Sequence, residues 1–286
     1  MTETIVLSGG SGFLGTRLRQ TLEASGFGVF NIPNNEETRF ALSNSSNAKL
    51  LVEGIARLEP SAIVHLAASY PITESTSEIY SSIQATVNLG TLLIDAAHRN
   101  DASFITTGSY WQFQGSIPRP VGFYATAKQA FSEIVSYYRN EHGMHATEVI
   151  LYDVYGPKDY RDKILPLLLK SSQSGAHIEL RRRDALINLT YVDDIVTGFM
   201  QILYEGNTPR MCDLRNESFI SIAELVETVE SVTGRRVNHS YTGESTKTLM
   251  TQPWVSCELL PGWSPRTDLP QGIRICWDDL QQSGIF

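Results

Sequence analysis

A tyrosine and a lysine stand four residues apart, at Tyr124 and Lys128, downstream of Ser109. On a helix, residues at this spacing share a face, with Cβ atoms about 5–6 Å apart. The lysine ammonium would then lie near the tyrosine phenol and favour its ionised form. A phenol has an unperturbed pKa of about 10, so such a neighbour makes it a usable proton donor and acceptor near neutral pH. The pair alone is weak evidence, because the spacing also occurs by chance in many helices.

A glycine-rich segment near the N-terminus could hold the hydride carrier that this pair would need. Residues 4–7 predict a buried parallel strand and residues 16–22 a helix, with Ser8-Gly9-Gly10-Ser11-Gly12-Phe13-Leu14-Gly15 between them. The glycines permit a tight turn, approach of backbone N–H groups to a pyrophosphate, and close packing of helix on strand. We therefore expect cofactor contacts from Gly9, Ser11, Gly12, Phe13, Leu14 and Gly15.

The first half of the chain alternates between strand and helix patterns. Strands are predicted at 28–32, 61–68, 103–107 and 147–152, and helices at 48–58, 86–98 and 124–140. This alternation indicates an α/β fold, a Rossmann-like doubly wound parallel sheet with helices on both faces. Ligands of such sheets bind beyond the carboxyl ends of the strands. We expect the glycine loop, residues 67–70, Ser109 and Asp153 to converge there.

Composition narrows the class of protein. The 286 residues carry a net charge of −8, which argues against sequence-independent binding of nucleic acid. Three scattered cysteines have no metal-ligand spacing, so we expect no metal site and a reducing compartment. We expect no membrane association, because no apolar run approaches the roughly 20 residues of a membrane span, and no signal peptide is visible. The prediction is a soluble cytoplasmic protein.

Together these motifs resemble the extended short-chain dehydrogenase/reductases, the nucleotide-sugar epimerase and dehydratase family, nearly end to end. Further landmarks are Val64-His65-Leu66-Ala67-Ala68, Tyr155-Gly156-Pro157, Tyr191-Val192-Asp193-Asp194 and Pro261-Gly262-Trp263-Ser264-Pro265. The resemblance implies a dinucleotide-binding domain over 1–162, with late segments near 186–215 returning to it. It also implies a smaller substrate-binding domain, mainly 163–286, and a homodimer formed through helices near 86–98 and 124–140.

The resemblance also implies roles for single residues. Tyr124 donates a proton to a carbonyl oxygen as hydride arrives from a nicotinamide. Lys128 favours the ionised phenol and hydrogen-bonds the nicotinamide ribose, and Ser109 orients the substrate oxygen, although Thr106 and Thr107 are neighbouring hydroxyls. Further cofactor contacts are expected from Leu66, Ala67, Ala68 and Thr107. His65 is expected to be a strand residue near the cofactor rather than a general base.

Departures from the family pattern reduce the number of candidate reactions. The 4,6-dehydratases of this family place an Asp-Glu pair after the catalytic hydroxyl residue, where this chain has Tyr110-Trp111. The epimerase-reductases that make GDP-fucose carry a nearby cysteine, and none lies near Ser109. Keto reduction and 4-epimerisation remain. The segments 109–112 and 153–163, with Ile187-Asn188, are similar to the CDP-abequose and CDP-paratose synthase branch of 4-ketoreductases.

The choice of cofactor depends on the end of the second strand. NAD-preferring folds place there an acidic residue that bonds the ribose 2′-hydroxyl. By alignment to the family this place falls at Pro33, near Asn31 and Asn34, which are the expected contacts, and Ala41 replaces a second acidic residue. Arg17 or Arg39 could supply positive charge, whereas Glu36 and Glu37 argue the other way. NADP(H) is favoured, with NAD(H) as the alternative.

The leading hypothesis is NADPH-dependent reduction of the C4 keto group of a CDP- or dTDP-linked 4-keto-6-deoxy or dideoxy sugar. The alternatives are a nucleotide-sugar 4-epimerase that holds NAD tightly and a non-catalytic dinucleotide-binding sensor. Residues that follow strand ends are the better candidates for the sugar pocket, and cationic residues for the diphosphate. The expected substrate contacts are Ser69, Tyr70, Ser109, Trp111, Asp153, Lys163 and Arg182, with Arg161 and Arg215 as further cations.

Overall fold

The computed structural model describes residues 2–33, 38, 42, 44–206, 208–243, 250 and 253–283. The chain folds into two compact units. The first comprises Met1–Leu151, Val196–Asp213 and Val255–Pro261. The second comprises Tyr152–Ile195, Leu214–Trp254 and Gly262–Phe286. The domain limits expected from the sequence, near 162 and 186–215, stay a prediction.

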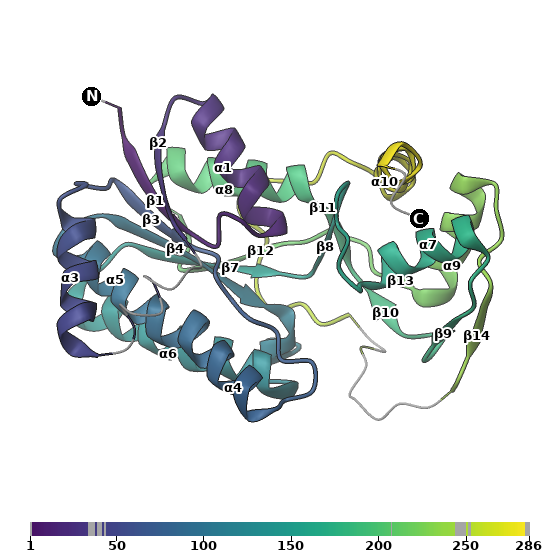
Figure 1. Cartoon of the computed structure of the whole chain (residues 1–286), viewed down its shortest axis with the longest axis horizontal. Coiled ribbons are helices and arrows are strands. Elements are labelled where there is room, and N and C mark those ends of the chain that lie inside the picture. Colours follow the sequence, from purple (N-terminus) through teal and green to yellow (C-terminus); the bar gives the residue numbers. More distant parts are fainter. Residues whose placement is uncertain are drawn as a thin grey trace. The chain divides into compact units, whose positions relative to one another are not determined.

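A six-stranded sheet forms the centre of the first unit (Figure 1). Its strand order is β12 (Met211–Leu214), β7 (Ala146–Leu151), β4 (Ser103–Ser109), β3 (Ala62–His65), β1 (Thr4–Ser8) and β2 (Gly28–Ile32). β1 pairs in parallel with β2 on one side and β3 on the other, and β3–β4 and β4–β7 are also parallel. The order therefore reverses at β1, which makes the carboxyl ends of β1 and β3 the switch point of a doubly wound sheet.

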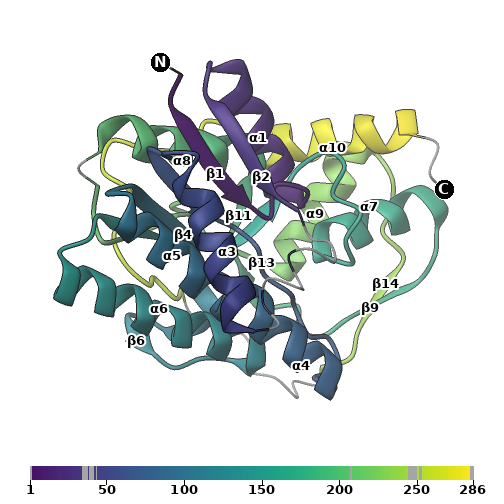
Figure 2. The same cartoon turned by 60° about the vertical axis from the view of Figure 1, so that its left-hand side comes forward.

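Helices cover both faces of this sheet (Figures 1 and 2). One face carries α1 (Phe13–Ala24) and α8 (Val192–Glu205), and the other α3 (Ser45–Ala56), α5 (Leu89–Arg99) and α6 (Gly122–His142). Between α3 and α5 and the sheet lies a layer of buried Ile, Leu, Val and Phe side chains, as expected for strands covered on both faces. The α/β prediction is confirmed.

Short elements connect these layers. α4 (Thr76–Ile83) runs into a π-helical segment, η1 (Gln84–Asn88), before α5, so the helix expected at 86–98 begins in a widened turn. After β4 comes a single 3-10 turn, η2 (Tyr110–Gln112), and then the hairpin of β5 (Phe113–Gln114) and β6 (Ile117–Pro118). The sequence patterns indicated neither α4 nor η2, because both are too short to show a clear apolar period.

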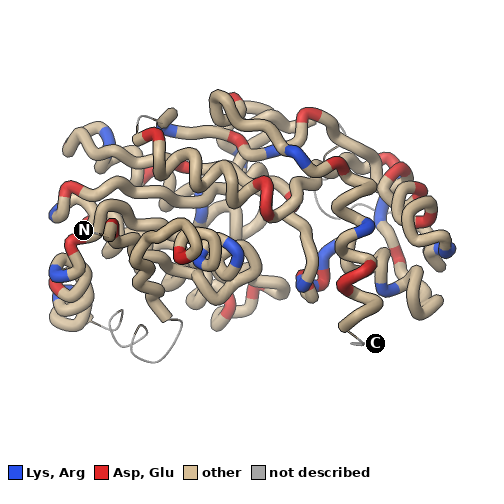
Figure 3. The backbone as a smooth tube through the Cα atoms, turned by 90° about the horizontal axis from the view of Figure 1, so that it is seen from above, with Lys and Arg blue, Asp and Glu red and all other residues tan. Residues whose placement is uncertain are grey.

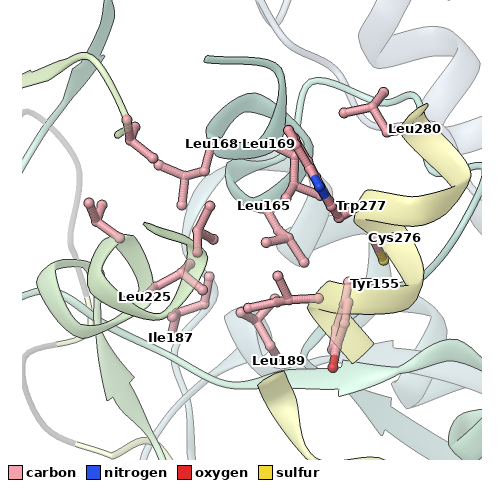
Figure 4. Close-up of a cluster of buried hydrophobic side chains, with 14 of the residues drawn as sticks. Tyr155, Leu165, Leu168, Leu169, Ile187, Leu189, Leu225, Cys276, Trp277 and Leu280 are labelled. Atoms are coloured by element: carbon pink, nitrogen blue, oxygen red, sulfur yellow. The ribbon is translucent and has the colours of Figure 1, made fainter. Parts of the chain in front are cut away.

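In the described part of the second unit, helices pack around small pairs of strands. Its core joins Tyr155, Leu165 and Leu225 to Cys276 and Trp277 (Figure 4). Gly272 lets the last helix cross Tyr155, because a Cβ there would lie 2.0 Å from the tyrosine Oη. The elements are β8 (Asp153–Tyr155), α7 (Ile164–Ser174), β9 (Ile178–Leu180), β10 (Leu186–Ile187), β11 (Leu189–Tyr191), β13 (Ile220–Ser221), α9 (Ile222–Thr233), β14 (His239–Tyr241) and α10 (Leu269–Ser283).

Charged residues of both signs are interspersed along both units (Figure 3). Among the described residues, no helix is long and apolar enough to cross a membrane.

Candidate active site

The glycine loop turns tightly over the end of β1. Gly9 has φ +78°, a conformation that favours glycine, and a Cβ there would lie 2.7 Å from the Ala67 backbone nitrogen. The Gly12 N–H donates to the Gly9 carbonyl at 3.0 Å. A Cβ on Gly15 would lie 2.0 Å from the same carbonyl oxygen. A larger residue at Gly9 would displace the loop from the segment that follows β3, and a larger residue at Gly15 would push the loop away from α1.

The loop feeds directly into α1. Gly12 is the N-cap residue and offers no side chain to the first turn, whose helical pattern opens with the Thr16 N–H donating to the Gly12 carbonyl at 2.8 Å. A helix N-terminus of this kind presents backbone N–H groups and the positive end of the helix dipole, which suit a phosphate. The segment around Ser11, Phe13 and Leu14 thus lies where a pyrophosphate binds in such folds.

Asn31 stands beside this loop near the end of β2. A Cβ on Gly10 would lie 2.2 Å from the Asn31 side-chain oxygen, so glycine gives the amide room against the loop. That oxygen is buried and has no hydrogen-bond partner among the described residues. A ribose hydroxyl would satisfy it, so the loop and Asn31 fit a pyridine dinucleotide. Asn34 lies outside the described residues, as do Glu36, Glu37, Arg39 and Ala41.

His65 is buried at the end of β3, next to the glycine loop's strand, β1. Its Nδ1 lies 2.7 Å from the Ser8 hydroxyl and its Nε2 lies 3.3 Å from the Thr86 carbonyl oxygen. Burial, and secondly the charge of Lys128, lower the pKa of His65 to about 3. The imidazole is therefore neutral near pH 7, with Nε2–H donating to the carbonyl and Nδ1 accepting from the hydroxyl. These bonds make it a link between β1, β3 and η1 rather than a general base.

Lys128 is held at the end of β4. Its side chain is buried, and its Nζ donates to the Thr107 carbonyl oxygen at 2.7 Å and to the Thr107 hydroxyl at 3.1 Å. Burial lowers the pKa of Lys128 to about 8, and the carboxyl group of Glu148 opposes that shift. α6 places Tyr124 one turn before Lys128, on the same side of the helix.

Three of the hydroxyl residues of β4, Thr106, Thr107 and Ser109, have different partners. Thr106 donates to the His65 carbonyl oxygen at 3.2 Å, and Thr107 binds Lys128. Ser109 ends the strand and caps η2, where its Oγ accepts from the Trp111 N–H at 3.3 Å. That bond leaves the Ser109 hydroxyl hydrogen available to a substrate oxygen. Among the three, Ser109 alone stands at the last position of the strand, where ligands of parallel sheets bind.

The Tyr70 ring lies beside both Tyr124 and a second aromatic side chain, Trp111. The Tyr70 ring lies 5.3 Å from the Tyr124 ring and 6.0 Å from the Trp111 ring, measured between centroids. We call Tyr70, Trp111 and Tyr124 the aromatic cluster. The loop that carries Tyr70 is tied to the start of α6, because the Phe123 N–H donates to the Glu74 carboxylate at 3.1 Å. Tyr70 remains 43% exposed, so the cluster offers an apolar surface beside the phenol.

Comparison with known proteins shows to which family this chain belongs. Residues 5–213 match the model of the NAD dependent epimerase/dehydratase family. The chain belongs to that family. Its members' chemistry needs a pyridine nucleotide, which the glycine loop and Asn31 fit, and the chain is accordingly an NAD(P)-dependent enzyme.

Two kinds of relative are similar to this chain in sequence. A CDP-abequose synthase of Yersinia pseudotuberculosis is 28% identical over 211 residues, covering 71% of this chain and 74% of the relative. UDP-glucuronate 4-epimerase 1 of Arabidopsis thaliana is 24% identical over 321 residues, covering 95% and 75%. Among solved structures, the UDP-glucose 4-epimerase of Thermotoga maritima has a TM-score of 0.82 at 17% identity, covering 98% of this chain and 99% of that one. These relatives are nucleotide-sugar enzymes, and the structural likeness shows the shared fold.

The other expected substrate contacts of this family member belong to the second unit. Asp153 begins β8, and its N–H donates to the Asn188 carbonyl at 3.0 Å. Lys163 is the N-cap residue of α7. Arg182 forms a two-bond ion pair with Asp184, which raises the pKa of the guanidinium. The ion pair uses guanidinium N–H groups of Arg182 that would otherwise be available to bind a diphosphate.

The sequence patterns missed a set of buried polar residues behind the site: Gln112, Ser132 and Glu148. A signal existed only for Ser132, which lies four residues after Lys128 and so shares its helix face. Glu148 lies within a strand pattern, where a charged residue is expected to face solvent. In the structure it is 2% exposed.

Proposed function

We propose that this enzyme reduces the C4 keto group of a CDP- or dTDP-linked 4-keto-6-deoxy or dideoxy sugar, with Tyr124 as the proton donor and NADPH as the favoured cofactor. The observation that carries the proposal is the turn after Ser109. It consists of Tyr110, Trp111 and Gln112, and the Gln112 side-chain oxygen caps the turn by accepting from the Ser109 N–H. No carboxylate stands there to abstract and return protons in an elimination.

The bound cofactor would supply the hydride to the C4 carbon. Ser109 would donate its hydroxyl hydrogen to the carbonyl oxygen and fix that oxygen near Tyr124. The Tyr124 O–H would then donate its proton as negative charge develops on the oxygen. Lys128, anchored on Thr107, would stabilise the phenolate that remains.

The aromatic cluster favours the proposal that the substrate is a deoxygenated sugar. Sugars that lack hydroxyl groups expose a larger apolar face, and the rings of Tyr70 and Trp111 offer apolar surface with defined edges next to the phenol. The relatives named CDP-abequose synthase favour CDP as the nucleotide. We therefore rank CDP-linked above dTDP-linked sugars.

NADPH is favoured by the residues at the end of β2. Residues 28–33 contain no Asp or Glu, and Asn31 presents a neutral amide to the glycine loop. A neutral residue repels no 2′-phosphate, whereas a carboxylate would. NAD(H) is the alternative cofactor.

A 4-epimerase with tightly held NAD is the second candidate function. Epimerases stand among both the relatives and the structural neighbours. The same three side chains would serve it, because epimerisation passes through a transient keto sugar. A non-catalytic dinucleotide sensor is disfavoured, because Tyr124, Lys128 and Ser109 are all retained.

The deciding experiment incubates the purified enzyme with NADPH and CDP- or dTDP-4-keto-6-deoxyglucose, and follows NADPH absorbance and the sugar product. Stoichiometric NADP⁺ formation with loss of the keto group supports reduction. Interconversion of UDP-glucose or UDP-glucuronate with their 4-epimers, without net cofactor turnover, would establish the epimerase and refute the proposal.

We also propose the homodimer that the resemblance implies, formed through the helical segments near 86–98, in η1 and α5, and near 124–140, in α6. α6 exposes the large side chain of Tyr137, at 54%. Light scattering of the purified chain should give twice the monomer mass, and Tyr137→Glu should shift the particle toward the monomer. A monomeric wild type would refute the proposal.

A further inference from the structure

A buried carboxylic acid lies behind the proposed catalytic residues. Glu148 is in the middle of β7, paired with Thr106 of β4. Its side chain is buried beneath α6, where Ser132 meets it. Burial of a carboxylic acid lowers the stability of the fold, because burial disfavours the charged form and removes the water that would hydrogen-bond the oxygens.

Hydrogen bonds connect this carboxyl group to Ser109. The Ser132 hydroxyl donates to Glu148 Oε1 and accepts from the Gln112 side-chain amide at 3.0 Å. The oxygen of that amide accepts from the Ser109 N–H at 2.7 Å. Gln112 is fully buried and is also the last residue of the turn that Ser109 caps. The carboxyl group therefore supports the turn from which Ser109 and Trp111 project.

Gly108 makes room for this chain of bonds. A Cβ there would lie 2.9 Å from both the Gln112 amide oxygen and Glu148 Oε1. Because the residue before Ser109 has no side chain, the amide and the carboxyl group can both approach the end of β4. The two polar groups thus occupy space that a larger residue would fill.

Charges of α6 face the carboxyl group from both sides. Lys128 lies one turn before Ser132, and Arg139 lies two turns after it, on the same buried face. Burial raises the pKa of Glu148, while the Ser132 hydroxyl bond and the charges of Arg139 and Lys128 oppose the shift. Cys257 also faces Glu148, and His65 faces Lys128. Glu148 in turn raises the pKa of Lys128, which burial lowers to about 8.

We propose that Glu148 is a positioning residue for the proposed reaction, which holds the Ser109 turn through Ser132 and Gln112 and acts as the buried counter-charge that keeps Lys128 protonated. The inference rests on the catalytic roles proposed above. Because the Glu148 carboxyl group raises the pKa of Lys128, removal of the carboxylate makes the lysine release its proton more readily.

A purely structural Glu148 would change stability without changing the titration of Lys128. The distinguishing measurement is therefore NMR of the full chain labelled with ¹³C at the lysine side chains, followed across alkaline pH. Lys128→Met assigns the resonance. In Glu148→Gln, which keeps the shape and removes the charge, we expect Lys128 to titrate at least about half a pH unit lower than in the wild type. An unchanged titration would overturn the proposal.

Two further variants support this test. Thr147→Val is the matched control, because Thr147 is the neighbouring buried residue on β7 and its hydroxyl bonds the Thr208 hydroxyl at 2.7 Å, away from Lys128. It should leave the Lys128 titration unchanged. If Glu148→Gln does not fold, Ser132→Ala takes its place. Loss of the Ser132 hydroxyl breaks the bonds that join the Glu148 carboxyl group to Gln112, so kcat/KM should fall relative to Thr147→Val, and an unchanged value would overturn the proposal.

An activity measurement separates this inference from the proposed function. With a reducible keto sugar, the alkaline limb of kcat/KM should move to lower pH in Glu148→Gln and stay in place in Thr147→Val. If the wild type reduces none of the keto sugars, the proposed reaction fails, whereas the NMR titration still decides whether Glu148 sets the charge of Lys128.

Discussion

The Lys128 ammonium donates two hydrogen bonds to Thr107, one to the carbonyl oxygen at 2.7 Å and one to the hydroxyl oxygen at 3.1 Å. One bond is to the backbone of β4 and survives any substitution, while the other depends on the side chain. The position of the lysine is therefore set by the strand, and its hydrogen bonding is completed by the residue type. Thr107 can be changed to test how much of the site depends on this second bond.

Thr107→Val should lower kcat/KM by about tenfold or more, because hydrogen bonds to charged groups contribute about 1.5–3 kcal/mol. Valine keeps the shape of threonine and removes the acceptor. Steady-state kinetics with NADPH and a keto sugar measure the effect. Thr107→Ser retains a hydroxyl and should stay close to the wild type; equal losses in both variants would contradict the role assigned to the hydroxyl.

Tyr124→Phe should abolish turnover while cofactor affinity stays near that of the wild type. The substitution removes the proton donor, and general acid catalysis contributes about 10²–10⁴-fold. The ring remains, so its packing against Tyr70 is kept. Fluorescence titration with NADPH and a turnover assay measure the two quantities, and unchanged turnover would refute the assignment.

Gly15→Ala should reduce dinucleotide affinity strongly. The new methyl group would lie 2.0 Å from the Gly9 carbonyl oxygen, so the loop must move away from the helix terminus. Gly54→Ala is the control: that glycine is in α3 with nothing within 4 Å of an added Cβ, and alanine favours the helix by about 0.5–1 kcal/mol. Calorimetric titration with NADPH and NADH should show the loss in the first variant alone.

Glu74→Ala should raise the KM for the sugar several-fold, with a smaller effect on NADPH binding. The carboxylate accepts the Phe123 N–H at the start of α6, and its loss releases the loop of Tyr70 from the helix of Tyr124. Glu133→Ala removes an exposed hydrogen bond elsewhere on α6 and serves as the control. If both variants show the same KM, the tether does not position the aromatic cluster.

His65 should make the enzyme less stable in mild acid. Its pKa is about 3 when folded and 6.5 when unfolded, so between these values the unfolded chain binds more protons. The free energy of unfolding therefore falls as pH decreases below about 6.5, by up to about 1.4 kcal/mol per pH unit from this group. Urea unfolding at several pH values measures the slope.

The slope should be shallower in His65→Gln, which has no titrating ring. His98→Gln provides the comparison, because His98 is exposed at the end of α5 and should keep the wild-type slope. A wild-type slope in His65→Gln would show that other groups cause the acid sensitivity.

The sequence by itself determined the helical spacing of Tyr124 and Lys128, the glycine loop and the parallel α/β fold. These features are local: Tyr124 and Lys128 share one helix, the glycines share one loop, and each strand shows its own apolar pattern. The α/β prediction was right because alternation of strand and helix leaves few ways to bury both faces of a sheet. The roles of the individual site residues stay predictions.

Only the tertiary structure decided which hydroxyl of β4 stands beside which partner, and what lies behind it. Thr106, Thr107 and Ser109 are alike in sequence, but the register of β4 against β3 and α6 directs them to His65, to Lys128 and to the capped turn. The sequence placed Glu148 only within the strand predicted at 147–152. Packing buried it between strand and helix, where burial raises the pKa of its carboxyl group and two cations oppose that shift. Such a non-local effect leaves no pattern in the chain.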